Sequence, residues 1–240
     1  KPEVVRGCVG LAAVVWAAAA LGGFVQSMAG FGGAIVIMAL LPFALPISEA
    51  AAVGDVITMV LSFSMFGQYR LAVDYRRIGW PAAAYLITSM AAIWSMRFIP
   101  AERLRGLFGF FLLGLAIYFM FFANGAAVPA GRLSQLSCGG LAGLCGGFFG
   151  ISGPAISLYY LAAMGTKEAY LGTINAFFSL TVVANLAGRI ANGHLSGVMF
   201  PIVIAGVASI LVGSAAGKAV AVRISMENMK RCVYVLMIFA

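Results

Sequence analysis

Long apolar runs separated by short charged stretches dominate this sequence. Most runs are continuously apolar over about 20 residues, which is the length of a helix that crosses the hydrocarbon core of a bilayer. Strands of membrane barrels are shorter and alternate apolar with polar residues, so a barrel is excluded. The runs cover about 7–45, 48–67, 79–98, 104–123, 133–164, 167–188, 197–217 and 228–240. The pattern predicts an all-α polytopic membrane protein with about eight apolar segments.

Two of these runs are too long for one crossing and too short for two full ones. Each is interrupted by glycines: Gly30, Gly32 and Gly33 in the first, and Gly146, Gly147 and Gly150 in the second. Glycine permits a break in a helix, and a broken helix at membrane depth is tolerated only where protein or a wet cavity surrounds it. We therefore expect each run to form a pair of packed half-helices or a re-entrant hairpin.

The two broken runs occupy equivalent places in an internal repeat. The stretch 23–31 aligns with 140–148. Three later residues keep the same relation: Glu49 with Glu168, Arg70 with Arg189, and Pro81 with Pro201. The shared offset of about 117 to 125 residues is typical of a duplication. We therefore divide one integral membrane domain into a first repeat, 1–124, and a second repeat, 125–240.

The relative direction of the two repeats depends on how the broken runs cross the membrane. If each run crosses once, each half has an even number of crossings and the repeats are parallel. If each run enters and leaves on the same side, that number is odd and the repeats are inverted. The loop Lys and Arg residues divide slightly more unevenly between the two sides in the hairpin case, as the positive-inside rule requires. We therefore favour inverted repeats.

The composition supports a membrane protein and narrows its function. Hydrophobic residues make up 63% of the 240 residues and charged residues 9%, and the mean hydropathy is +1.05. Soluble domains carry about 25% charged residues. The single histidine, His194, and four scattered cysteines argue against metal and haem sites, so no cofactor or metal is expected. The net charge of +8 fits the positive-inside rule better than nucleic-acid binding. Because the chain lacks an initial methionine and ends inside an apolar run, we expect it to be trimmed.

The breaks indicate an anion site. A half-helix that begins inside the membrane leaves backbone N–H groups unpaired, and the helix dipole adds partial positive charge at that end. Such helix starts bind anions without a basic side chain. After the second break, Ser152 is expected to cap the next half-helix and Pro154 to occupy its first turn. Gly139 and Gly143 are instead typical of close helix packing.

Polar residues in the following segments strengthen this prediction. Asp55, Thr58 and Ser62 lie on one helix face, and Asn175 and Ser179 lie one turn apart in the second repeat. A carboxylate within a membrane helix is costly unless it is paired, protonated or hydrated, so Asp55 is the candidate for proton coupling. The alternative is a structural Asp55 bonded to nearby hydroxyls or to freed backbone. The predicted substrate-binding residues are Gln26, Ser27, Gly30, Gly32, Gly33, Gly147, Gly150, Ser152, Gly153, Asn175 and Ser179.

Arg70 and Arg189 stand at matching segment ends. One interpretation is that they guide anions into a cavity. The other, which we favour, is that their side chains extend to the membrane interface, as basic residues at helix ends commonly do.

The motifs at 23–33 and 140–153, each opening a half of about four apolar segments, resemble the sulfite exporter TauE/SafE family of membrane permeases. The resemblance covers most of the chain. It implies movement of sulfite, of sulfonates such as sulfoacetate, or of other small anions across a bacterial-type cytoplasmic membrane. The first motif departs from a proline-containing pattern, because Ala34 follows Gly33 where the second repeat has Pro154.

These features favour a secondary transporter of a small anion that works by alternating access at a site between two broken helices. The sequence has no nucleotide-binding loop, so a gradient must supply the energy. A passive anion channel is the alternative, and an enzyme is not expected, because an intramembrane enzyme would need a nucleophile with a base or a metal cluster. The expected partners are the anion, the lipid bilayer and coupling protons, with a second copy of the chain also admissible and nucleic acid not expected.

Overall fold

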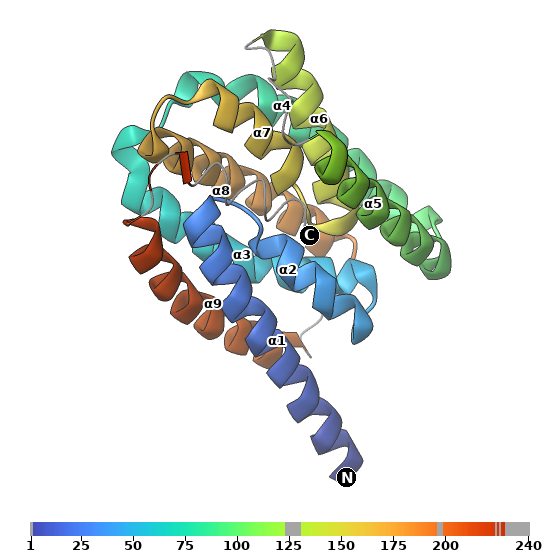
Figure 1. The fold of residues 1–240 in the computed structure, drawn as a ribbon. Coiled ribbons are helices and arrows are strands. Elements are labelled where there is room, and N and C mark those ends of the chain that lie inside the picture. Colours follow the sequence, from blue (N-terminus) through green and yellow to red (C-terminus); the bar gives the residue numbers. More distant parts are fainter. Residues whose placement is uncertain (1, 123–130, 196–198, 224, 226, 229–240) are drawn as a thin grey trace.

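The computed structural model describes residues 2–122, 131–195, 199–223, 225 and 227–228, and all regular structure in these ranges is helical. The all-α prediction is therefore confirmed for the described chain (Figure 1). The helices are α1 (Pro2–Ala29), α2 (Gly33–Leu40), α3 (Ile47–Tyr69), α4 (Gly79–Ser95), α5 (Ala101–Phe122), α6 (Arg132–Phe149), α7 (Gly153–Ala163), α8 (Lys167–Ala191) and α9 (Phe200–Ala221). Short 3-10 turns extend α2, α3 and α4.

Four stretches in the described ranges are long and apolar enough to span a bilayer: Ala12–Ala29, Ile47–Ala72, Lys167–Ala191 and Phe200–Ala221. Helices occupy the first seven of the predicted apolar runs, and nearly all of the eighth lies outside the described residues. Large apolar side chains such as Phe43 and Leu71 are almost fully exposed, which suits a surface that faces lipid. The chain is an integral membrane protein.

Both broken runs form helical hairpins. At the first break, a Cβ built at Gly22 would lie 2.9 Å from the carbonyl oxygen of Gly33, so α2 starts beside the body of α1 and runs back along it. At the second, Gln135 Nε2 in the first turn of α6 donates to Tyr159 Oη of α7 at 2.8 Å, so α7 folds back along α6. The breaks fall at the predicted glycines.

Glycine is required at these turns by backbone conformation. Gly30 and Gly32 have φ values of 84° and 103° at the first break, and Gly150 has a φ of 70° at the second. Residues with a Cβ are strained in this left-handed region, whereas glycine is not. A reversal within three residues is therefore specified locally by the sequence.

Close packing of small residues joins each hairpin to one further helix. Along α9, Gly213 and Gly217 lie against the backbone of Ala20 and Phe24 of α1, and Ser209 donates to the Trp16 carbonyl. Along α6, the same four-residue interval recurs: Gly139, Gly143 and Gly147 lie against Pro81, Tyr85 and Ser89 of α4. In both pairs the helices run parallel, and the missing side chains let the backbones approach. The predicted packing role of Gly139 and Gly143 is confirmed.

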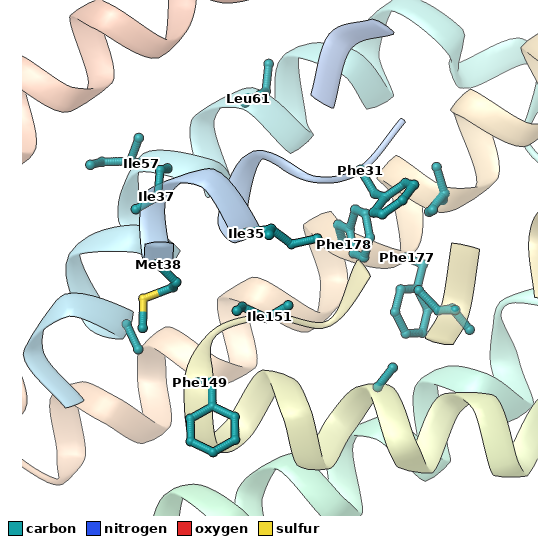
Figure 2. Close-up of a cluster of buried hydrophobic side chains, with 14 of the residues drawn as sticks. Phe31, Ile35, Ile37, Met38, Ile57, Leu61, Phe149, Ile151, Phe177 and Phe178 are labelled. Carbon is teal, nitrogen blue, oxygen red and sulfur yellow. The ribbon is translucent and has the colours of Figure 1, made fainter. Parts of the chain in front are cut away.

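Helices α3 and α8 run antiparallel between these two packed units. Asp55, early in α3, contacts Arg189 near the end of α8. At the opposite end, Gly172 lies against the Tyr69 backbone, and the Asp74 N–H donates to Thr173 Oγ1 at 3.0 Å. Phe31 and Ile151, one from each break, are buried in the same apolar cluster as Phe178 of α8 (Figure 2). The core therefore holds both breaks in the middle of the bundle.

Candidate functional site

A small, partly open cavity with mostly buried wall residues lies where the two hairpin turns meet α3, α4 and α8. Gly32 and Ala34 line it from the first break, and Ser152 and Gly153 from the second. The breaks also touch directly, since a Cβ built at Gly153 would lie 2.7 Å from Cδ2 of Phe31. The remaining wall consists of Gln26, Ile35, Asp55, Thr58, Ser62, Tyr85, Gly150, Phe178, Thr181, Val182 and Asn185. The cavity thus draws on residues from both halves of the chain.

The cavity is small. The volume in which the centre of a water molecule fits is about 40 Å³. The cavity therefore has room for a few waters or for one compact ion.

Two helices begin at this cavity without side-chain caps. Gly32 precedes α2 and Ser152 precedes α7, and at neither helix start does a backbone N–H donate to a capping side chain. The predicted capping by Ser152 is therefore wrong, whereas Pro154 does lie in the first turn of α7. In α2 the first turn closes with the Val36 N–H donating to the Gly32 carbonyl at 3.1 Å, which leaves the preceding N–H groups free of the helix ladder. Both helix dipoles place their positive ends at the cavity.

The carbonyl ends of α1 and α6, the helices that precede the two breaks, accept hydrogen bonds from side chains of α8. Arg189 Nη2 donates to the carbonyls of Gly146 and Gly147 at 2.9 and 2.8 Å, at the end of α6. Tyr170 Oη donates to the Ala29 carbonyl at 3.1 Å, at the end of α1. Arg189 and Tyr170 both belong to α8 and neither lines the cavity. Side chains of α8 therefore hold the carbonyl ends of α1 and α6, while the uncapped starts of α2 and α7 lie at the cavity.

Asp55 and Arg189 form a buried ion pair. Arg189 Nε donates to Asp55 Oδ2 at 2.8 Å, and the two residues are 0% and 4% exposed. The prediction that Arg189 reaches the membrane interface is wrong, because Arg189 is fully buried and its guanidinium bonds α3, the last turn of α6 and Met96 Sδ. The alternative, in which Asp55 bonds nearby hydroxyls or freed backbone, is also wrong. Asp55 bonds Arg189, and the Thr58 hydroxyl instead donates to the Gly54 carbonyl of its own helix at 2.8 Å. Arg70, by contrast, is exposed at the end of α3.

Two further polar pairs stand on the cavity wall. Gln26 Nε2 donates to Ser62 Oγ at 3.3 Å, and Asn185 Nδ2 donates to Tyr85 Oη at 2.8 Å. Asn185 Oδ1 is buried and has no hydrogen-bond partner among the residues that the structure describes. The sequence did not identify Tyr85 or Asn185 as candidate site residues. Asn185 had a readable signal, because Thr181, Asn185 and Arg189 follow one another at four-residue intervals on one face of α8.

The structure separates the predicted site residues into two groups. Lining the cavity are Gln26, Gly32, Asp55, Gly150, Ser152 and Gly153. The others pack or bond beside it: Ser27 donates to Ser214 Oγ at 2.8 Å, Asn175 donates to the Leu171 carbonyl at 2.9 Å, and Ser179 Oγ is buried without a described partner. Gly30 lies against Tyr170, Gly33 against Gln26, and Gly147 against Ser89. Substrate binding by any of these residues remains a prediction.

Comparison with known proteins places the chain in a family. The family model described as sulfite exporter TauE/SafE matches residues 15–240, a range that includes both breaks and every cavity residue. No curated protein and no solved structure matches the chain. Because the family match spans nearly the whole sequence, it implies that the chain is a membrane transporter. The chain belongs to the sulfite exporter TauE/SafE family.

Proposed function

We propose that this protein is a secondary transporter of a small oxyanion, such as sulfite, which binds in the cavity between the starts of α2 and α7. One observation carries the proposal: two uncapped helix starts, one from each half of the chain, lie at a single cavity. Each start contributes about half a positive charge and free N–H donors, so together they form an anion site without a basic side chain on its wall.

The helix arrangement supports inverted repeats. The equivalent helices α3 and α8 are antiparallel, as an axis lying in the membrane plane requires. The pairs α1 with α9 and α6 with α4 are both parallel, so exchanging the halves maps one pair onto the other. In transporters built this way, the site lies at the repeat interface and opens to each side in turn. We propose the same alternating access here, in a bacterial-type cytoplasmic membrane.

The size of the cavity and the burial of its wall residues favour a small substrate and argue against the alternative of a passive channel. About 40 Å³ suits a compact oxyanion such as sulfite better than the longer, doubly charged sulfoacetate. Most wall residues, including Thr58, Thr181 and Val182, are buried. A small cavity lined by buried residues from both halves of the chain favours a transporter that binds one anion at a time over a passive channel with a continuous pore.

Flux measurements test this proposal. Purified protein in proteoliposomes should take up labelled sulfite with a rate that saturates, and unlabelled sulfite inside the vesicles should accelerate uptake. Sulfate and acetate, with protein-free vesicles, serve as comparisons. A flux that neither saturates nor responds to internal sulfite would identify a passive channel. No flux of any small sulfur-containing anion would contradict the proposed function.

We further propose that Asp55 couples transport to protons. A proton on Asp55 would remove the negative charge that holds Arg189, and the released positive charge would favour an anion in the adjacent cavity. Asp55→Asn should therefore keep sulfite exchange but lose accumulation driven by an imposed pH difference. Glu49→Gln is the matched control, because Glu49 lies on the same helix in its first turn and does not line the cavity. Proton-driven accumulation that persists in Asp55→Asn would place coupling elsewhere.

A further inference from the structure

We infer that Tyr170 of α8 is a positioning residue for the anion site, and that it acts through the backbone of the first break. This inference rests on the proposed function and assigns a further residue to the same site. Three features carry it: the conformational freedom of the break, a hydrogen bond from the Tyr170 hydroxyl, and the packing of the Tyr170 ring.

The first break does not fix its own shape. Residues 30–32 turn the chain from α1 into α2, and Gly30 and Gly32 both have positive φ. Glycine adopts positive and negative φ about equally readily, so the peptide groups beside it reorient at little cost. In the described chain no side chain caps the start of α2. A contact from another helix is therefore needed to select one conformation of the break.

Tyr170 supplies such a contact. Its hydroxyl donates to the Ala29 carbonyl at 3.1 Å, and the N–H of the same peptide group, which belongs to Gly30, donates to the Gln26 carbonyl at 2.7 Å. The peptide group that opens the break is thus held at both of its polar atoms. Gly32, which lines the cavity with backbone atoms, follows Ala29 by three residues. The position of the uncapped start of α2 therefore depends on this peptide group.

Packing holds the Tyr170 hydroxyl in place. Tyr170 is 0% exposed, and a Cβ built at Gly30 would lie 2.8 Å from its Cε1, so the ring fills the space that a side chain would take. Tyr170 lies in the first turn of α8, which Thr166 caps by accepting from the Ala169 N–H at 3.3 Å. Because Tyr170 does not line the cavity, it acts on an anion there only through the break.

The second break is held in a comparable way, by Arg189. Its guanidinium donates to the Gly146 and Gly147 carbonyls, but it also binds Asp55, so a change at Arg189 disturbs the ion pair as well. The donor at the first break is a neutral hydroxyl. Tyr170 is therefore the position at which the effect of holding a break can be measured without altering a buried charge.

The Tyr170→Phe variant tests the inference, because it keeps the ring against Gly30 and removes the hydroxyl. Its KM for sulfite exchange in proteoliposomes should rise about five- to tenfold, since one hydrogen bond no longer orients the N–H groups that bind the anion. The exchange rate at saturating sulfite should stay within twofold. An unchanged KM, with or without a loss of thermal stability, would show that Tyr170 only satisfies a buried carbonyl and would overturn the inference.

Two control variants separate the hydrogen bond from stability and from packing. Tyr160 is also 0% exposed, and its hydroxyl donates to the Arg77 carbonyl at 3.3 Å without lining the cavity. Tyr160→Phe should therefore keep the normal KM. Ile174 packs at the first break, since its Cγ2 would lie 3.4 Å from a Cβ built at Gly30, and Ile174→Val should also keep the normal KM. If either control raises KM as much as Tyr170→Phe does, the hydrogen bond is not the cause and the inference fails.

A second variant decides if Tyr170→Phe does not fold. Gly30→Ala keeps the hydroxyl but places a methyl group against the ring, so it should push Tyr170 away from Ala29 and raise KM at least as much. A normal KM in Gly30→Ala would contradict the inference. Failure of the proposed function looks different: the unaltered protein would then exchange no sulfite. Normal exchange by the unaltered protein with an unchanged KM in Tyr170→Phe leaves the function standing and refutes the role of Tyr170.

Discussion

Arg189→Leu should destabilise the protein by about 3–5 kcal/mol and abolish transport. The substitution leaves Asp55 buried without its partner at 2.8 Å. It also removes the donors to the Gly146 and Gly147 carbonyls, which lie in the last turn of α6 next to the second break. Both losses occur beside the cavity, so the start of α7 would no longer be held in place. Thermal unfolding of the detergent-purified protein, followed by size-exclusion chromatography, measures the effect.

A double variant distinguishes an uncompensated charge from lost packing. In Asp55→Asn with Arg189→Gln no charge remains buried, so much of the lost stability should return. Arg97→Leu is the control, because Arg97 is exposed and its contacts with Asn192 and the Trp94 ring lie at the surface, so its loss should cost within about 1 kcal/mol. If Arg189→Leu is no less stable than Arg97→Leu, the buried pair does not hold the fold together.

Gly153→Leu should abolish sulfite transport while the protein still inserts into the membrane. A Cβ at this position would lie 2.7 Å from the Phe31 ring, and the rest of a leucine side chain would occupy a cavity of about 40 Å³. It would also separate the two breaks, which touch through this contact. Initial rates in proteoliposomes, normalised to the amount of incorporated protein, measure the loss.

A glycine at the other end of the same hairpin provides the comparison. Gly165 is exposed and follows α7, and a Cβ built there meets no heavy atom within 4 Å. Gly165→Leu should therefore transport at the normal rate, and Gly153→Ala should fall between the two, because a methyl group displaces Phe31 without filling the cavity. Normal transport by Gly153→Leu would mean that Gly153 only packs helices and does not line the site.

Features that depend on a few adjacent residues could be read from the sequence alone. The helical membrane class follows from apolar runs about as long as a bilayer is thick. The breaks at Gly32 and Gly150 follow from a backbone conformation that glycine adopts without strain. The packing role of Gly139 and Gly143 follows from their four-residue spacing on one face of a helix. Each is a local property, so a single sequence contains it.

The partners of polar side chains were decided by the tertiary structure. Asp55 and Arg189 are 134 residues apart in the chain, and they meet because α3 and α8 are antiparallel at the centre of the bundle. By sequence, Arg189 resembles a basic residue at the end of a membrane helix, and only the fold shows that its guanidinium is enclosed. Ser27 resembles a site residue but bonds Ser214, whereas Asn185 gains its place on the wall because Tyr85 binds its nitrogen. Hydropathy and spacing determine which face of a helix is polar, but the three-dimensional arrangement of the helices determines what that face meets.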